Sequence, residues 1–159
     1  MARYWLMKSE PSVFSFEDLV RSPGRTTHWE GVRNYQARNL MRDEFKLGDR
    51  AFFYHSNTDE PSVVGVMEIV QPGYPDDSAL DPKSHYYDER TKNNSVSPWV
   101  RVDVKAVQRM HTPVSRAMLA GHSATRSMMV LRRGARLSVQ PVTQPEFDAV
   151  CRLGKPGDL

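Results

Sequence analysis

Short apolar runs separated by turn-forming residues dominate the chain, and they predict more strands than helices. Compact apolar and aromatic runs are typical of buried strands, and one longer run alternates apolar with polar positions, as a half-buried strand does. Gly65 lies inside one of these runs and marks a bulge or a close backbone approach. Pro141 is expected to end the last run. The predicted strands span residues 4–7, 51–54, 63–70, 99–107 and 137–139.

Capping residues predict where short helices begin. Ser15 with Asp18, and Thr143 with Glu146, have the spacing of a capping box, in which each side chain bonds the backbone of the other residue. Asn34 is a good N-cap for the helix that follows it. The predicted helices span residues 16–21, 35–45, 113–119, 127–132 and 147–153.

The order of these elements predicts the fold class. Strands outnumber helices and do not alternate regularly with them, which favours an α+β domain with a curled, barrel-like, antiparallel-rich sheet. Residues 71–98 hold four of the eleven prolines and predict a long loop, a feature that is often functional. The length of 159 residues suits one domain over residues 1–159.

Charge is sorted along the chain although the formal net charge is only +3. Residues 59–100 contain eight acidic and three basic side chains, whereas residues 101–136 contain eight basic side chains and one acidic side chain. Sixteen of the 22 basic residues are arginines, whose guanidinium groups suit contact with phosphate and base edges. Nucleic acid is therefore a candidate partner. A GC-rich genome together with a solvated helix face explains the same charges.

Several other classes of function lack their usual motifs. The sequence has no glycine-rich phosphate loop, its five histidines are scattered, and Cys151 is the single cysteine, so neither a metal nor a cofactor is expected. Asp76 and Asp77 are interpreted as solvated turn carboxylates. No nucleophile–base pair is evident, which weighs against an enzyme. No apolar run is long enough to span a membrane or to form a signal peptide, and we expect a soluble, monomeric, bacterial protein of the cytoplasm.

Polar side chains gather at strand ends and at one helix start, where a fold alone does not require them. Lys8, Ser9 and Glu10 directly follow the first predicted strand, and residues 54–57 end the central one. Residues 28–38 place an aromatic ring and several hydrogen-bonding side chains at the start of a helix. Such a cluster is a natural site for an anion or a ligand.

These motifs together resemble the EVE domain family. The matching segments occur in the family's order and extend from residue 3 to about residue 150. They are residues 4–11 (YWLMKSEP), 29–38 (WEGVRNYQAR), 54–57 (YHSN), 74–76 (YPD) and 136–141 (RLSVQP).

The resemblance implies a PUA-like fold, which is an α+β curled mixed sheet or pseudo-barrel flanked by short helices and shared with YTH and ASCH domains. Relatives in this family are implicated in binding DNA that carries modified cytosines. We therefore expect a non-catalytic domain that reads a modified, flipped base in an aromatic pocket. DNA with a modified cytosine is the favoured partner, and RNA is the alternative.

Candidate site residues follow from the motifs. Aromatic rings are expected to stack on the base, short neutral side chains to read its edge, and basic side chains to contact phosphates. The expected base-pocket residues are Ser9, Trp29, Val32, Asn34, Tyr35, Ser56, Asn57, Tyr74 and Tyr87. The expected phosphate rim is Lys8, Arg33, Arg38, Arg132, Arg133 and Arg136.

Structural roles compete with these functional ones. Trp29 fits a core anchor as well as a stacking wall, Asn34 is also a helix cap, and Ser56 with Asn57 can simply form a turn. Two other functions also stay open at this point. One is an enzyme that acts on RNA or a nucleotide, and the other is a module that binds a small molecule or a protein terminus.

Overall fold

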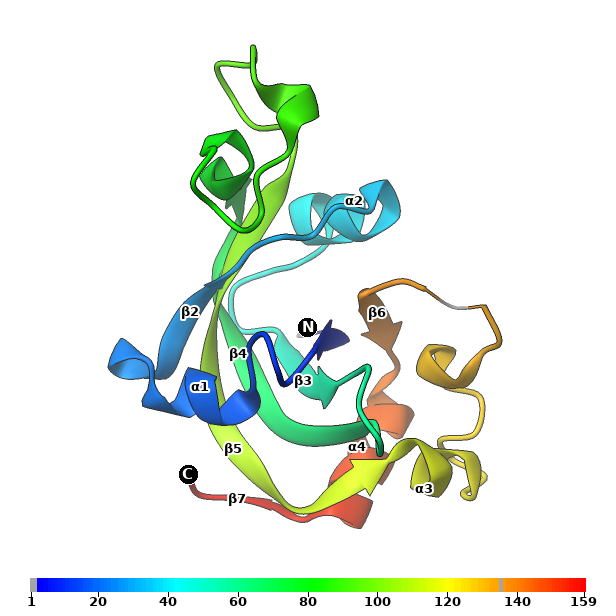
Figure 1. Cartoon of the computed structure of the whole chain (residues 1–159). Helices are drawn as coiled ribbons and strands as arrows, with labels where there is room; N and C mark the ends of the chain where they lie inside the picture. The colour runs from blue at the N-terminus through cyan, green and yellow to red at the C-terminus, as the bar shows by residue number, and fades with distance from the viewer. Residues whose placement is uncertain (1–2, 135) are drawn as a thin grey trace.

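In the computed structural model, which describes residues 3–134 and 136–159, seven strands form one strongly curled sheet (Figure 1). The spatial order is β2-β5-β4-β3-β1-β6, and β7 pairs with β5. β1 and β3 are parallel, and the other neighbours are antiparallel. The strands are β1 (Tyr4–Ser9), β2 (Thr26–Trp29), β3 (Arg50–His55), β4 (Ser62–Pro75), β5 (Val100–Ser115), β6 (Val139–Val142) and β7 (Pro156–Gly157). The expected α+β architecture with a curled mixed sheet is confirmed.

The central strands are buried on both faces, which explains their continuous apolar sequences. In β1, Trp5 and Met7 join one hydrophobic cluster, and Leu6 joins the other. In β3, Phe53 joins the cluster of Trp5 and Met7, and Phe52 joins the cluster of Leu6. Successive side chains of a strand point to opposite faces, so each of these strands contributes to two separate layers of packing.

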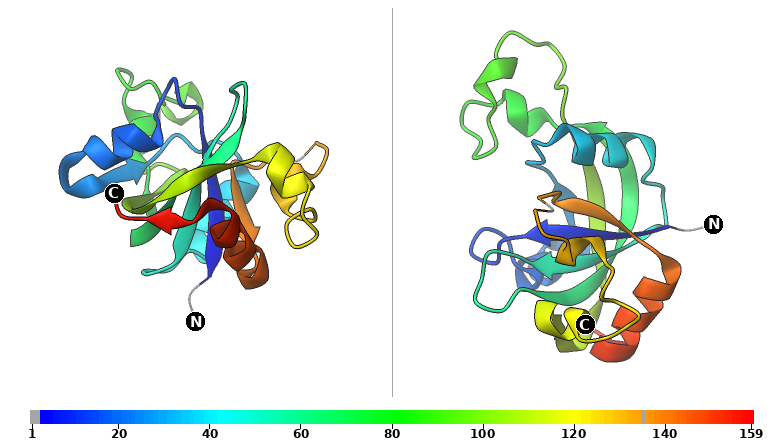
Figure 2. Two further views of the ribbon diagram at one scale, coloured as in Figure 1. Left: turned by 90° about the horizontal axis from the view of Figure 1, so that it is seen from below. Right: turned by 90° about the vertical axis from the view of Figure 1, so that its right-hand side faces the viewer.

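Short helices cover the two faces of the sheet and close its ends (Figures 1 and 2). Ser15 and Thr143 form the capping boxes that the sequence predicts, and Asn34 caps its helix by accepting a hydrogen bond from the Ala37 N–H. The α-helices are α1 (Phe16–Arg21), α2 (Tyr35–Asp43), α3 (Arg116–Ala120) and α4 (Gln144–Gly154). The 3₁₀ helices are η1 (Pro23–Arg25), η2 (Asp77–Leu80), η3 (Glu89–Thr91) and η4 (Met129–Leu131).

Several predicted boundaries are wrong. β4 and β5 extend well beyond the predicted runs, so the long loop shortens to residues 76–99 and contains η2 and η3. β5 includes Pro113, which was expected to begin a helix. Pro141 lies inside β6 and does not end it, because β6 is an edge strand, where a missing backbone N–H is tolerated. β2 and β7 were not predicted, since neither has a long apolar run.

Gly65 shows why some strand positions carry glycine. The register of β3 and β4 shifts near this residue, and a Cβ added to it would lie 2.3 Å from the ring of Phe16. The predicted bulge and close approach are therefore both present, and they allow α1 to pack against the sheet. Among residues 3–134 and 136–159, no helix has the length and apolar character needed to cross a bilayer.

Candidate functional site

A cavity of about 640 Å³ opens beside the end of β1, the strand β2 and the segment that leads from β2 into α2. This volume lies within the range of roughly 300–1,000 Å³ that is typical of ligand pockets. The lining residues are Lys8, Ser9, Glu10, Val13, Phe14, Thr27, His28, Trp29, Glu30, Gly31, Val32, Arg33, Asn34, His85, Tyr86 and Ser138. The cavity thus brings together the two motifs at residues 8–11 and 28–38.

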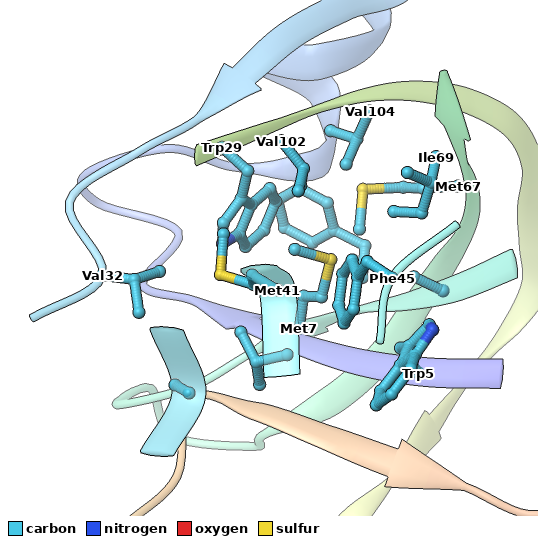
Figure 3. Packing of buried hydrophobic residues seen from close by; sticks show 14 of the residues in the cluster. Trp5, Met7, Trp29, Val32, Met41, Phe45, Met67, Ile69, Val102 and Val104 are labelled. Atoms are coloured by element: carbon cyan, nitrogen blue, oxygen red, sulfur yellow. The ribbon is translucent and has the colours of Figure 1, made fainter. Parts of the chain in front are cut away.

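Trp29 lines this cavity, but most of its ring belongs to the core. The side chain is only 7% exposed, and its ring meets Phe53 edge-on at a centroid distance of 5.3 Å. Figure 3 shows it packed among Met41, Val102 and other buried side chains. Trp29 therefore presents a small part of its surface to the cavity and not an open face on which a base can stack.

Phe14 and Tyr86 supply the other aromatic surfaces of the cavity. Gly31 has a positive φ of 86°, and a Cβ added to it would lie 2.4 Å from the Tyr86 ring. Tyr86 therefore packs directly on the backbone of Gly31. Burial, followed by the nearby Glu30 carboxylate, raises the pKa of the Tyr86 phenol, so the side chain is neutral at ordinary pH.

The Asp76 carboxylate bonds the backbone segment on which Tyr86 packs. Its side chain is fully buried and accepts hydrogen bonds from the Gly31 N–H at 3.0 Å, Arg33 Nη1 at 2.9 Å, and the N–H and hydroxyl of Ser78. Arg33 Nη2 then donates to the carbonyl of Tyr86 at 2.6 Å. Burial acts to raise the pKa of Asp76, but these hydrogen bonds outweigh it and hold the pKa below its usual range.

The interpretation of Asp76 as a solvated turn carboxylate is therefore wrong, whereas Asp77 is exposed as expected. Arg33, expected at the phosphate rim, uses its guanidinium group inside this network. It connects the segment before α2 to Asp76 and Tyr86 of the β4–β5 connection.

Lys8 and Ser9 form part of the cavity at the end of β1. Burial, with the repulsion of Arg116, lowers the pKa of the Lys8 ammonium below its ordinary value. Among the described residues, no carboxylate lies within ion-pairing distance of Lys8. Ser9 Oγ donates to the Phe14 carbonyl at 2.6 Å, which keeps Phe14 beside the strand end.

His28 connects the cavity with a polar cluster on the neighbouring strands. Its Nδ1 lies 2.7 Å from Asp103 Oδ1 and 2.9 Å from the Tyr74 hydroxyl, which also donates to Asp103. Burial, followed by the hydrogen bond and charge of Asp103, raises the pKa of Tyr74 to about 12. Tyr74 thus contacts His28, but it is not among the residues that line the cavity.

Four other predicted pocket residues lie outside the lining. Tyr35 is exposed and stacks on Trp99 with ring centroids 4.7 Å apart. Tyr87 lines a neighbouring hollow of about 290 Å³. Ser56 and Asn57 lie beside the strand end, where the Ser56 N–H bonds the Ser9 carbonyl and the Asn57 amide donates to Glu10 at 3.1 Å. These two residues directly follow β3 and therefore connect the end of β3 to the end of β1.

The remaining predicted rim arginines also lie outside the lining. Arg38 Nη1 donates to the carbonyl of Pro98 at 3.0 Å, so its guanidinium group is already engaged. Arg132, Arg133 and Arg136 are exposed in the connection between η4 and β6. Among the predicted residues, the cavity brings together Lys8, Ser9, Trp29, Val32, Arg33 and Asn34.

Several lining residues were not among the expected site residues, and they include Phe14, Thr27, His28, Tyr86 and Ser138. His28 lies inside the motif at residues 28–38, Thr27 directly precedes it, and Phe14 follows the motif at residues 4–11, so a position in or near those motifs was the available signal. Ser138 belongs to the motif at residues 136–141, whereas Tyr86 lies outside every motif, and the sequence contains no local signal that prefers Tyr86 to its neighbour. The described part of the chain contains no group of three or more His, Cys, Asp or Glu side chains arranged to hold a metal ion.

Comparisons with known proteins place this geometry in a family. Human thymocyte nuclear protein 1 is 44% identical over 169 residues, which cover 96% of this chain and 74% of that protein. A crystal structure from Pseudomonas syringae has a TM-score of 0.87 and 43% identity over 94% of this chain and 98% of that one. The crystal structure of human THYN1 protein in complex with DNA containing 5-methylcytosine has a TM-score of 0.86 and 42% identity, covering 97% and 98% of the two chains. The EVE domain model matches residues 3–153, and this chain belongs to the EVE domain family.

Proposed function

We propose that this protein binds DNA containing a modified cytosine and takes the modified base into the cavity beside β1 and β2. One observation carries the proposal: the cavity combines aromatic surfaces with polar groups, in a chain that is 42% identical to a protein solved with 5-methylcytosine DNA. The expected pocket residues Ser9, Trp29, Val32 and Asn34 belong to this proposed site, and Phe14 and Tyr86 are added to it.

The energetics of base flipping favour such a cavity. Extruding a base from a duplex costs a few kcal/mol, and stacking on an aromatic side chain contributes roughly 1–3 kcal/mol per base. Phe14 and Tyr86 line the cavity, and neither is fully buried, so each has surface on which a base can pack. A modified cytosine enters the cavity if this stacking, together with hydrogen bonds to its edge, offsets the cost of leaving the duplex.

Lys8 is the cation that we assign to the bound nucleotide. Its ammonium group is half-buried in the cavity lining and has no carboxylate partner among the described residues. A cation in this position compensates the charge of a phosphate that approaches the flipped base. Arg132, Arg133 and Arg136 are proposed to contact the DNA backbone farther away, without reading sequence.

The narrower expectations are proposals of the same kind. We propose that binding involves no catalysis, that DNA is preferred to RNA, and that residues 1–159 act as a single monomeric domain. The expected bacterial source and cytoplasmic location have no support from the relatives, which include both eukaryotic and bacterial proteins.

The test compares a duplex with a single 5-methylcytosine, the same duplex without the methyl group, and RNA of the same sequence. Fluorescence anisotropy is expected to show tighter binding to the methylated duplex, and mass spectrometry is expected to find the nucleic acid unchanged. Equal affinity for the methylated and unmethylated duplexes would refute the proposal. A product detected by mass spectrometry would instead identify an enzyme.

Two neighbouring tyrosines provide a matched pair of variants. Tyr86 lines the cavity, whereas Tyr87 lines the hollow beside it. Tyr86→Ala is expected to lower the affinity for the methylated duplex by about 5- to 150-fold, as the loss of one stacking contact predicts. Tyr87→Ala should bind nearly as the wild type does. The opposite ranking would place the base in the neighbouring hollow.

A further inference from the structure

All three tryptophans are buried, but their indole N–H groups differ in hydrogen bonding. Trp5 Nε1 donates to Asp49 Oδ2 at 3.0 Å, and Trp99 Nε1 donates to Asp88 Oδ2 at 2.8 Å. Trp29 is more than nine-tenths buried, yet no acceptor for its Nε1 lies within hydrogen-bonding distance in the described part of the chain. Buried indole N–H groups usually find a partner, so this one calls for an explanation.

The unpaired N–H of Trp29 is open to the cavity and not sealed in the core. Within residues 3–134 and 136–159, Arg101 Nε is the one fully enclosed side-chain nitrogen or oxygen that lacks a partner. Trp29 Nε1 therefore keeps access to solvent, and the cavity is the space that Trp29 lines. In Figure 3 the indole nitrogen lies on the side of the ring that faces Val32, which lines the same cavity.

We propose that Trp29 is a specificity-determining residue whose indole N–H donates a hydrogen bond to the base held in the cavity. The inference rests on the proposed function. The indole nitrogen is a donor only, so its partner on the base must be an acceptor. Cytosine offers its ring nitrogen N3 and its carbonyl oxygen O2. Trp29 thus reads the base edge from the cavity wall, in contrast to the stacking role expected from the sequence.

The indole N–H resonances provide a direct test, because the chain has only three tryptophans. In a nitrogen–proton correlation spectrum of the free protein, the Trp29 signal should exchange with water faster than the signals of Trp5 and Trp99, which are bonded to carboxylates. Addition of a duplex with a single 5-methylcytosine should slow this exchange and move the Trp29 signal downfield. The other two indole signals are internal controls and should stay in place.

Substitution of the same position tests the contribution to affinity. Trp29→Phe keeps an aromatic ring in the core and removes the donor. A benzothienylalanine at position 29, in which sulfur replaces the N–H, preserves the shape and guards against a packing defect. Loss of one hydrogen bond predicts a fall in affinity of roughly 2- to 13-fold for the methylated duplex in both variants. Trp99→Phe, which removes a donor outside the cavity, should leave the affinity unchanged.

Two failures can be told apart. If the backbone amides of residues 31–34 shift on adding methylated DNA while the Trp29 indole does not, the inference is overturned and the proposed function stands. Unchanged affinity of the benzothienylalanine protein overturns it in the same way. If neither the amides nor the indole respond and no binding is measured, the proposed function fails, and the inference fails with it.

Discussion

Replacement of Asp76 tests whether a buried carboxylate holds the cavity wall in place. Asp76→Ala leaves the Arg33 guanidinium without its ion-pair partner, and it leaves the backbone N–H groups of Gly31 and Ser78 without an acceptor. Removing one partner of a buried ion pair costs about 3–5 kcal/mol. For a domain of this size each kcal/mol lowers the melting temperature by about 2–4 °C, so a decrease of roughly 6–20 °C is expected.

Asp77→Ala is the matched control, because Asp77 is the next residue and its side chain is exposed. Surface substitutions of this kind usually change stability by no more than about 0.5 kcal/mol. Thermal melting and binding to methylated DNA are measured on the same preparations. An Asp76→Ala protein that melts within about 2 °C of the wild type would refute the assigned role of the carboxylate.

The pH dependence gives the same prediction a second readout. The pKa of Asp76 in the folded protein lies below its ordinary value, since hydrogen bonds from Ser78, Gly31 and Arg33 together outweigh the effect of burial. A carboxylate with a depressed pKa stabilises the fold above its unfolded pKa, which is about 3.9, and loses this contribution as the pH falls. The stability difference between the wild type and Asp76→Asn should therefore shrink below about pH 4. A difference that stays constant down to pH 2 would contradict the assignment.

Three further predictions concern the cavity wall, the basic loop and the cysteine. Gly31→Ala should lower both stability and affinity for methylated DNA, because its new methyl group would collide with the Tyr86 ring; Gly48→Ala has a similar φ of 89° but open space, and should lower stability alone. Arg132→Ala combined with Arg133→Ala should weaken binding to modified and unmodified DNA alike and reduce the slope of log affinity against log salt by roughly one to two, whereas an unchanged slope would place these arginines off the binding face. Burial raises the pKa of the Cys151 thiol to about 11, so alkylation at pH 8 should be slow and should accelerate up to about pH 11; rapid labelling at pH 8 would contradict the burial.

Local patterns in the sequence were enough to predict much of the secondary structure. Capping by Ser15, Asn34 and Thr143 depends on contacts within three residues, and all three caps form. The compact apolar runs at residues 4–7 and 51–54 become strands buried on both faces, because only such a position covers every side chain. The motifs at residues 8–11 and 28–38 also lie where the structure has its cavity, at the end of β1 and before α2.

The outline of the cavity depends on contacts between residues that are distant along the chain. Arg33 lies 43 residues from Asp76 and 53 residues from Tyr86, and these contacts exist because the β4–β5 connection folds back over the segment before α2. No sequence pattern distinguishes Tyr86, which lines the cavity, from Tyr87, which lines the neighbouring hollow.

Asp76 and Trp29 show the same division between sequence and tertiary structure. Asp76 has the local sequence of a solvated turn. In the folded protein it is buried, and it accepts hydrogen bonds from Gly31 and Arg33, which are distant along the chain. Trp29 packs against Phe53 in the core and also lines the cavity, a position that the sequence did not distinguish from a purely buried or a stacking one. The sequence by itself determined the caps, the buried strands and the family, because these depend on neighbouring residues or on recognisable motifs. Tertiary structure alone decided which side chains surround the cavity, because that depends on where distant segments cross.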